Sequence, residues 1–275
     1  MQRERFTIMK HNRIAKDVFQ LELSGDVSQI SAPGQFVNLQ IPGFYLRRPI
    51  SISDWTIDDE AKKSRLFLIY KVVGEGTNKL SQLAIGEELE LLLPLGTGFD
   101  VSKTTSNTVL CGGGVGVPPL VALARQMIAA GKKPQVLLGF NSKEDVFGLT
   151  LFQELGIEPL VTTVDGSQGI KGFVTDVLNN LTFDYICCCG PEGMLKAIHD
   201  FSLVTPKGAS EDMSTRSQSL QTQNTIDGQF SLEARMACGF GACMGCSKKT
   251  KTGYKRICRE GPVFEKSELV WEVTK

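Results

Sequence analysis

The sequence is poor in histidine and has no excess charge of either sign. Only two histidines, His11 and His199, occur among its 275 residues, and 30 basic residues balance 30 acidic ones. Histidine-based catalysis and a Rieske-type cluster, in which two histidines replace cysteines, therefore have little to draw on. No motif of paired carboxylates is present either. A balanced charge gives no field that would draw the protein toward nucleic acid or an anionic membrane surface.

Long hydrophobic segments are also absent. No apolar run reaches the roughly 18 residues that a membrane-spanning helix needs. The opening segment, MQRERFTIMKHNRIAKDVFQLEL, is charged and has no apolar core of the signal-peptide kind. The sequence therefore predicts a soluble, cytoplasmic protein that binds neither nucleic acid nor a membrane.

The apolar fraction of 41% over this length suits two domains with well-filled cores. Residues 1–101 contain short apolar runs separated by turn residues, a pattern typical of a β-sandwich or barrel. These runs are VFQLEL, GQFVNLQI, PISISDW, RLFLIYKVV and ELELLLPL, with one helical piece at residues 78–83. Residues 102–204 then alternate strand-like and helix-like runs, which predicts βαβ units and a parallel sheet.

The last part of the chain has a different composition. Residues 205–228 are rich in Ser, Thr and Gln and have no hydrophobic periodicity, which predicts a polar linker. Residues 229–275 read as a compact module with a closing strand, and they hold four of the eight cysteines. In a cytosolic chain of this length, cysteines are more often metal ligands or buried thiols than disulfides.

The four C-terminal cysteines have the spacing Cys238-x4-Cys243-x2-Cys246-x11-Cys258. This order matches the plant-type [2Fe–2S] pattern, in which one loop supplies three ligands and the fourth returns from elsewhere. Glycines between the ligands relieve crowding and let backbone N–H groups approach the sulfurs. The spacing favours a [2Fe–2S] cluster over a four-cysteine zinc site, which more often uses two C-x2-C pairs, and over plain thiols.

Two segments in the first half have residues that suit a phosphate-bearing nucleotide, and the family resemblance that they carry implies that this nucleotide is a flavin. In Arg47-Arg48-Pro49-Ile50-Ser51, an arginine can pair with a pyrophosphate and a serine can bond the flavin ring edge. In the segment from Ile69 to Thr77, glycines precede a helix start, where backbone amides favour a phosphate, and Tyr70 can pack against the isoalloxazine or adenine ring. The competing interpretations are an edge strand with a solvated arginine, and a hairpin turn with a core tyrosine.

The first of these segments resembles the R-x-[YFIL]-[ST] motif of the ferredoxin–NADP reductase superfamily. The second half resembles the same superfamily in the loop from Cys111 to Leu120, which follows a strand and opens a helix, and in Cys189-Gly190-Pro191-Glu192-Gly193-Met194. In that superfamily the loop lies beneath the nicotinamide dinucleotide, and the position of Cys189 faces the nicotinamide and the flavin. For Cys187 and Cys188 core packing is the expectation. The segment from Asn141 to Asp145 lacks an arginine pair for a 2′-phosphate, although Ser142 and Lys143 could contact one, so NAD is favoured over NADP.

Taken together, RRPIS, GGGVGVPP and ACGFGACMGC…YKRICREGPVF resemble the electron-transfer subunits of dihydroorotate dehydrogenase B along essentially the whole chain. NAD-dependent ferredoxin–NADP transhydrogenases and sulfhydrogenases have related subunits, which stay open as alternatives, as does a non-enzymatic redox-sensing nucleotide-binding module. The gap between Cys246 and Cys258 is short for this group, which affects one cluster loop but not the chemistry. The polar stretch 205–228 is longer than usual, which puts in doubt how the cluster is held against a partner.

The resemblance implies an oxidoreductase component with an antiparallel β-barrel flavin domain (1–101), a parallel-sheet α/β nucleotide domain (102–204), the polar linker (205–228) and a small C-terminal [2Fe–2S] module (229–275). It implies FAD, a [2Fe–2S] cluster and NAD(H) as cofactors. The partner would be an FMN-containing dihydroorotate dehydrogenase catalytic subunit in pyrimidine biosynthesis, in a heterotetramer with two copies of each subunit.

The residues expected at these sites fall into three groups. Those expected at the flavin are Arg48, Pro49, Ile50, Ser51, Ile69, Tyr70, Lys71, Gly76 and Thr77. Those expected at the nicotinamide nucleotide are Gly112, Gly113, Gly114, Gly116, Cys189, Gly190 and Pro191. The expected cluster ligands are Cys238, Cys243, Cys246 and Cys258.

Overall fold

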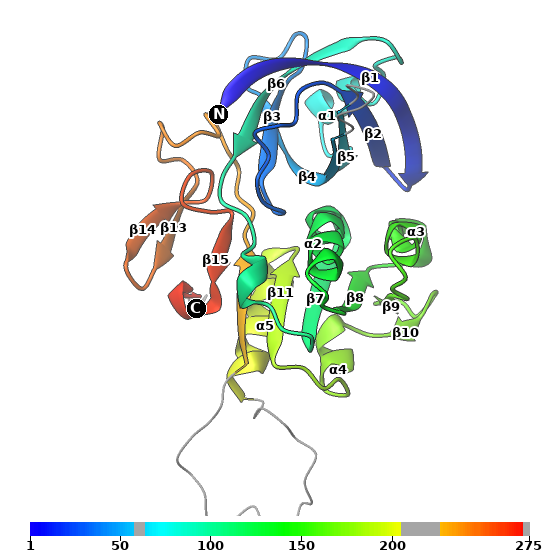
Figure 1. The fold of residues 1–275 in the computed structure, drawn as a ribbon, viewed down its shortest axis with the longest axis vertical. Coiled ribbons are helices and arrows are strands. Elements are labelled where there is room, and N and C mark those ends of the chain that lie inside the picture. The colour runs from blue at the N-terminus through cyan, green and yellow to red at the C-terminus, as the bar shows by residue number, and fades with distance from the viewer. Residues whose placement is uncertain (58–63, 205–225, 272–275) are drawn as a thin grey trace, which may run out of the picture.

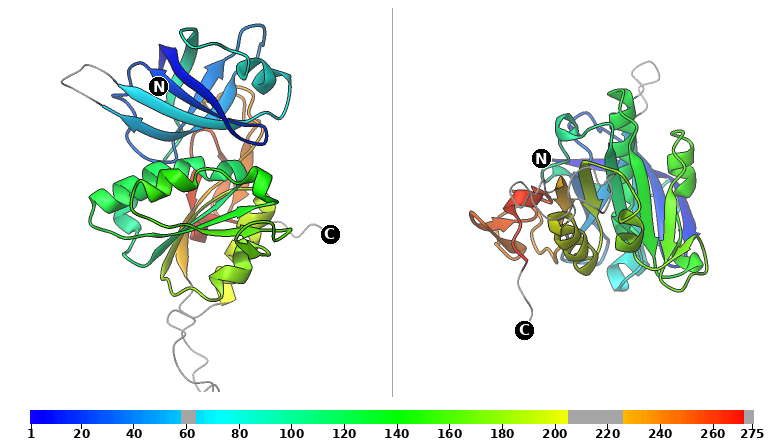
Figure 2. Two further views of the ribbon diagram at one scale, coloured as in Figure 1. Left: turned by 90° about the vertical axis from the view of Figure 1, so that its right-hand side faces the viewer. Right: turned by 90° about the horizontal axis from the view of Figure 1, so that it is seen from below.

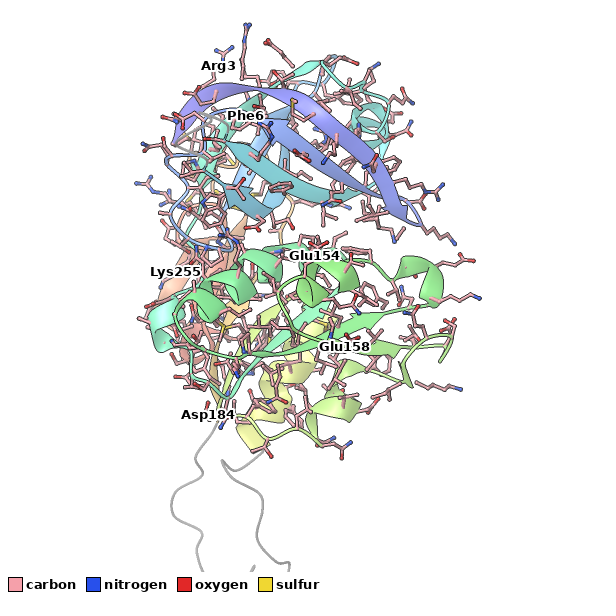
Figure 3. The ribbon with its side chains drawn as sticks, turned by 45° about the vertical axis from the view of Figure 1, so that its right-hand side comes forward. Arg3, Phe6, Glu154, Glu158, Asp184 and Lys255 are labelled. Atoms are coloured by element: carbon pink, nitrogen blue, oxygen red, sulfur yellow. The ribbon has the colours of Figure 1, made fainter. Side chains whose placement is uncertain are left out.

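The computed structural model describes residues 1–57, 64–204 and 226–271. Its first part is a closed antiparallel barrel with the strand order β1-β2-β5-β4-β3-β6 (Figure 1). The strands are β1 (Gln2–Ala15), β2 (Val18–Ser24), β3 (Phe36–Gln40), β4 (Arg48–Thr56), β5 (Arg65–Lys71) and β6 (Glu88–Leu95), and helix α1 (Glu75–Leu80) follows β5. Alternate residues fill the barrel, as the period of two requires. Phe6, which lies beneath β1 in Figure 3, and Leu21 of β2 are both fully buried in this core.

The second part is a seven-stranded sheet with the order β10-β9-β8-β7-β11-β12-β15. Its strands are β7 (Thr108–Gly113), β8 (Gln135–Phe140), β9 (Leu160–Thr163), β10 (Ile170–Lys171), β11 (Tyr185–Cys189), β12 (Asp227–Ser231) and β15 (Val263–Glu265). The helices are α2 (Pro118–Ala129), α3 (Leu149–Gln153), α4 (Val174–Leu178) and α5 (Glu192–Val204), with 3-10 turns η1 (Val101–Lys103), η2 (Gly114–Gly116), η3 (Lys143–Asp145) and η4 (Lys266–Glu268). All neighbouring strands run parallel except β15, which is antiparallel to β12. The expected barrel and parallel α/β sheet are both confirmed.

The C-terminal residues are built into this sheet. Strand β12 pairs with β11 and β15 pairs with β12, so both extend the nucleotide sheet at one edge. The cysteine loop and the hairpin of β13 (Ser247–Thr250) and β14 (Gly253–Arg256) lie outside it, beside the barrel and the sheet (Figures 1 and 2). Most of the expected linker 205–228 lies outside the described residues, and its last two residues, Asp227 and Gly228, begin β12.

Helix α2 lies between the sheet and the barrel (Figure 1). Its Arg125 forms an ion pair with Asp54 of β4, with Nε 2.9 Å from Oδ1, and donates to the backbone oxygen of Trp55 at 3.0 Å. The guanidinium group also lies over the Trp55 ring, 5.5 Å from its centroid. These contacts set the position of the barrel relative to the sheet.

Among the described residues, no helix is both long and apolar enough to cross a membrane.

Candidate functional site

The two expected flavin segments meet in space. Arg48 begins β4, and Gly76 lies in the first turn of α1. A Cβ atom built on Gly76 would be 2.5 Å from the Nε atom of Arg48, so the guanidinium group rests directly on this glycine. The fold therefore places the expected pyrophosphate-binding arginine over the helix start that was expected to favour a phosphate.

The two adjacent arginines have different surroundings. Arg47 forms an ion pair with Glu90 and donates to the backbone oxygen of Asn38 at 3.3 Å, so it braces the barrel. Arg48 donates to the backbone oxygen of Leu46 and lies over the Phe44 ring, 5.1 Å from its centroid. No carboxylate pairs with Arg48 among the described residues, so its guanidinium group can bind an anionic ligand bidentately.

The structure corrects the expected role of the Tyr70 ring. This side chain is 1% exposed and points into the barrel, where it stacks on Phe19 and its hydroxyl lies 2.8 Å from Nε2 of His11. Burial raises the pKa of the Tyr70 phenol. The ring cannot pack against a flavin or an adenine, so Tyr70 can contact a cofactor only through its backbone. Neighbouring residues of a strand alternate between faces, and this alternation was the signal that could have shown it.

Thr77 and Lys71 also have defined partners. The Thr77 hydroxyl accepts hydrogen bonds from the backbone N–H of Val73 and Gly74, at 2.9 and 3.2 Å, and so closes the turn before α1. Lys71, at the end of β5, lies 3.5 Å from the Asp145 carboxylate across the boundary between barrel and sheet. Lys71 therefore faces the nucleotide side of that boundary as well as the flavin side.

The nucleotide loop (Cys111 to Leu120) and the motif from Cys189 to Met194 are in close contact. Strand β7 runs through η2 into α2, and a Cβ atom on Gly116 would overlap the backbone oxygen of Cys189 at the end of β11. A Cβ on Gly113 would be within 3.1 Å of Pro191 Cδ and would overlap Met194. The glycines are therefore required by the close approach of two strand ends, which brings both sequence motifs to one edge of the sheet.

At this edge lies a cavity of about 630 Å³, above the carboxyl ends of β7, β8 and β9. Of the residues expected at the cofactors, Gly113, Gly114, Pro191 and Lys71 line it. Carboxyl ends of parallel strands are the usual place for a nucleotide in open α/β sheets. The cavity is also lined by residues that sequence reasoning did not select, including Asn141, Asp145, Thr162, Phe173 and Thr175. Asn141 and Asp145 lie in the segment that was considered for coenzyme choice, whereas Phe173 gave no signal.

The thiols of the sheet are buried. Cys187 and Cys188 are fully inaccessible, which confirms core packing for both. Cys189 is 2% exposed, and burial raises the pKa of its thiol to about 12, against a smaller lowering by a hydrogen bond with Ser231. Cys189 is therefore a neutral thiol at neutral pH.

We expect Gly116→Ala to push the nucleotide loop away from the end of β11. The added methyl group would overlap the carbonyl of Cys189, so either loop must shift. Overpacking of this kind costs about 1–3 kcal/mol. The rate of flavin reduction by NADH should fall while the cluster signal persists. Ala129→Leu, at an exposed position in the last turn of α2, is a control for the general effect of added apolar atoms; equal rates in wild type and Gly116→Ala would contradict the expectation.

The four C-terminal cysteines form two pairs. Cys258 lies beside Cys246, since its backbone N–H donates to Cys246 Sγ at 3.4 Å, and the side chain of Cys243 lies within interaction range of Cys238. No three or more His, Cys, Asp or Glu side chains of the described residues surround a single metal position. In a [2Fe–2S] cluster each iron takes two protein ligands, so two adjacent pairs are the arrangement that this cluster requires. The donor set fits the cluster.

Backbone N–H groups point at the sulfurs. Ala242 N–H donates to Cys238 Sγ at 3.3 Å, Gly245 N–H to Cys243 Sγ at 3.5 Å, and Cys258 N–H to Cys246 Sγ at 3.4 Å. Burial acts to raise the pKa of Cys238, but hydrogen bonds from the backbone of Phe240, Cys243 and Ala242 outweigh it and lower the pKa to about 6. This loop therefore stabilises a thiolate, which is the form that binds iron.

Arg256 links the two parts of the cysteine loop. Its Nη1 donates to the backbone oxygen of Gly241 at 2.6 Å, between the first two ligands, and its Nε donates to Glu260 at 3.0 Å, beyond the last ligand. The hydrogen bond from Arg256 lowers the pKa of Glu260 to about 2, so this carboxylate stays charged in neutral solution. Arg256 therefore holds the returning ligand segment against the three-cysteine loop.

We expect Arg256→Ala to weaken retention of iron by about 10–100-fold, as is usual for residues that orient metal ligands. The measurement is the rate of iron release to a chelator from the reconstituted protein. Lys255→Ala is a matched control, because Lys255, which is labelled in Figure 3, lies in the same hairpin and pairs with Glu268 rather than with the ligand loop. Equal release rates for the two variants would show that Arg256 does not brace the loop.

Comparison with known proteins agrees with this geometry. Residues 233–270 match the family model described as the iron–sulfur cluster binding domain of dihydroorotate dehydrogenase B. The chain is 42% identical to the dihydroorotate dehydrogenase B (NAD(+)) electron transfer subunit of Fusobacterium nucleatum, over 98% of this chain and 99% of that one. It is 40% identical to the subunit of the same name from a Geobacillus species, over 98% and 99% of the two chains.

Solved structures show the same fold. An NADH-dependent reduced ferredoxin–NADP oxidoreductase, described in connection with flavin-based electron bifurcation, superposes with a TM-score of 0.79 at 28% identity and covers 97% of this chain and 90% of its own. Phthalate dioxygenase reductase shares the fold, with a TM-score of 0.59 at 20% identity over 90% of this chain and 86% of its own. The identity of 40–42% to these curated relatives extends over nearly the full length of each chain and decides the assignment. This chain belongs to the family of dihydroorotate dehydrogenase B (NAD(+)) electron transfer subunits.

Proposed function

We propose that this chain carries electrons between NAD(H) and a dihydroorotate dehydrogenase catalytic subunit, through FAD and a [2Fe–2S] cluster. The observation that carries the proposal is the succession of sites along one side of the fold. The nucleotide cavity at the edge of the sheet faces Lys71 at the end of β5, the flavin segment lies on β4, and the cysteine loop lies against the neighbouring strand β3. The family membership supports the same function, because the relatives are named electron transfer subunits.

The protein contributes positions and electrostatic environments. Arg48 and the amides at the start of α1 would hold the FAD pyrophosphate, and the glycine loops of β7 and β11 would hold NAD(H). Cys238 and Cys243 would bind one iron and Cys246 and Cys258 the other. When bound, these groups supply hydride exchange between nicotinamide and flavin and single-electron exchange between flavin and cluster. Cys189, a buried and neutral thiol, would support the nucleotide loop from behind, where its backbone lies against Gly116.

The partner is part of the proposal. The absence of a motif for acid–base chemistry on a substrate in the sequence supports a substrate site on another chain, a catalytic subunit that carries FMN. Cys243 is exposed on the cysteine loop, beside Phe240 and Met244, which are 43% and 52% exposed. These side chains support docking of the partner at the cluster, in an assembly with two copies of each subunit. None of the eight cysteines, which all lie in the described residues, forms a disulfide, and this supports a reducing, cytoplasmic location.

The proposal gives each part of the chain the role expected from the sequence. We assign residues 1–101 to FAD, 102–204 to NAD(H) and 229–275 to the cluster, with β12 and β15 shared between the last two. NAD rather than NADP is the proposed coenzyme, because the segment from Asn141 to Asp145, which contributes to the cavity lining, has no arginine pair for a 2′-phosphate.

The test is reconstitution of the purified chain with an FMN-containing dihydroorotate dehydrogenase subunit. Orotate formation coupled to NAD reduction should require both chains. NAD reduction that proceeds without the partner, or orotate-coupled NAD reduction that proceeds without this chain, would contradict the proposal.

A second candidate is the corresponding subunit of an NADH-dependent ferredoxin–NADP transhydrogenase. The similarity in structure to the reduced ferredoxin–NADP oxidoreductase favours it. The reconstitution separates the two candidates, because a transhydrogenase subunit would not support orotate formation.

A further inference from the structure

Strand β3 lies between the flavin segment and the cluster. Its residues alternate: Val37 and Leu39 fill the barrel, whereas Phe36 and Asn38 face outward. Phe36 belongs to the same buried cluster of side chains as Cys246 and Cys258. On its other edge β3 pairs with β4, where Asn38 is opposite Pro49 of the flavin segment. One strand therefore touches both sites.

Asn38 makes the polar contact from this strand to the cysteine loop. Its side chain is 1% exposed, and its Nδ2 donates to the backbone oxygen of Cys238 at 3.1 Å. A buried asparagine in an otherwise apolar strand costs free energy unless its groups are bonded. Here only one side of the amide is bonded, since Oδ1 is buried and accepts no hydrogen bond from the described residues.

The cysteine loop is shaped to receive this side chain. Gly239 has φ of +74°, and a Cβ on it would overlap Nδ2 of Asn38. Both the backbone conformation and the close approach therefore require glycine at this position. The loop and the asparagine fit one another directly after the first cluster ligand.

The bond to the Cys238 carbonyl has a consequence for the sulfurs. A peptide unit is planar and trans, so its C=O and N–H groups point in opposite directions. Holding this carbonyl on the barrel turns the N–H of Gly239 away from β3 and fixes the start of the loop, in which the N–H of Ala242 donates to Cys238 Sγ at 3.3 Å. N–H groups directed at the cluster stabilise the added negative charge of its reduced form and raise its reduction potential.

We propose that Asn38 is a positioning residue for electron transfer: it fixes the cluster loop on the flavin barrel and sets the reduction potential of the cluster. The inference rests on the proposed function, in which the cysteines hold a [2Fe–2S] cluster. Asn38 then ties the Cys238 end of the loop to β3, and Cys246 and Cys258 lie in the buried core that includes Phe36 of the same strand.

The test compares Asn38→Leu, which keeps the volume but removes the hydrogen bond, with wild type. The full chain is reconstituted with iron, sulfide and FAD. We measure the iron content, the EPR spectrum of the reduced cluster, its midpoint potential, and the rates of flavin and cluster reduction after mixing with NADH. We expect unchanged flavin reduction, a more negative cluster potential, a shifted EPR spectrum, and cluster reduction slowed about tenfold.

Gln40→Leu is the matched control, since Gln40 shares the outward face of β3 but donates only to the backbone oxygens of Ile41 and Phe44. Asn38→Ser, which is too short to reach Cys238, should change the potential and spectrum in the same direction if Asn38→Leu does not fold. A wild-type potential and spectrum in a variant that lacks the bond would overturn the inference. A wild-type chain without cluster or flavin signals would instead overturn the proposed function.

Discussion

Arg48→Ala should weaken FAD binding about 10–100-fold. A charge-assisted hydrogen bond contributes about 1.5–3 kcal/mol, and each 1.4 kcal/mol corresponds to about a tenfold change in the dissociation constant. Arg48 has no competing carboxylate among the residues that the structure describes, and it rests on Gly76 at the start of α1. Flavin retained after gel filtration, and FAD affinity from fluorescence titration, measure the effect.

Two other arginine variants make the comparison specific. Arg48→Lys keeps the charge but loses the bidentate geometry, so its FAD affinity should lie between those of wild type and Arg48→Ala. Arg5→Ala removes a barrel arginine that is 75% exposed and pairs only with Glu88, so it should bind FAD as wild type does. Wild-type affinity in Arg48→Ala would place the pyrophosphate elsewhere.

Cys258→Ser should abolish the cluster while leaving the flavin bound. The substitution removes one of the two thiols of its pair, and Cys258 is buried against the hydrophobic core that includes Phe36. Iron per chain should fall from about two to near zero, and the EPR signal of the reduced protein should disappear. The expected FAD segments lie on β4 and between β5 and α1, outside the cysteine loop, so NADH should still reduce the flavin.

The matched control is Cys188→Ala, which removes an equally buried thiol from the nucleotide sheet. It should cost some stability but no iron. If Cys258→Ser kept two irons, or if Cys188→Ala lost them, the assignment of the ligands would be wrong.

Much of the fold follows from local patterns in the sequence. The run ELELLLPL predicts β6 with the bounds found in the structure, and QVLLGF predicts β8 in the same way. The long strand β1 was not expected, because charged residues alternate through it and conceal its buried face, which includes Phe6 and Ile8. The pairing of β12 and β15 with the nucleotide sheet was also not expected, since pairing between distant segments leaves no local signal.

The residues of the candidate site were likewise predictable only in part. Glycines that permit a close approach, such as Gly116, are recognisable because few other residues fit their surroundings. The orientation of Tyr70 depends on which face of β5 lines the barrel, and aromatic side chains suit both a core and a cofactor site. Asn38 and Arg256 act through contacts with distant backbone oxygens, of Cys238 and Gly241. Such contacts depend on tertiary structure and cannot be read from spacing along the chain.

The most direct test of the account is a count of cofactors in anaerobically purified protein, from its absorption spectrum together with iron, sulfide and flavin per chain. The account predicts about two irons, two sulfides and one FAD, with flavin and cluster bands that both bleach on addition of NADH. Zinc in place of iron, or a colourless protein without flavin, would contradict the electron-transfer function and leave only the fold.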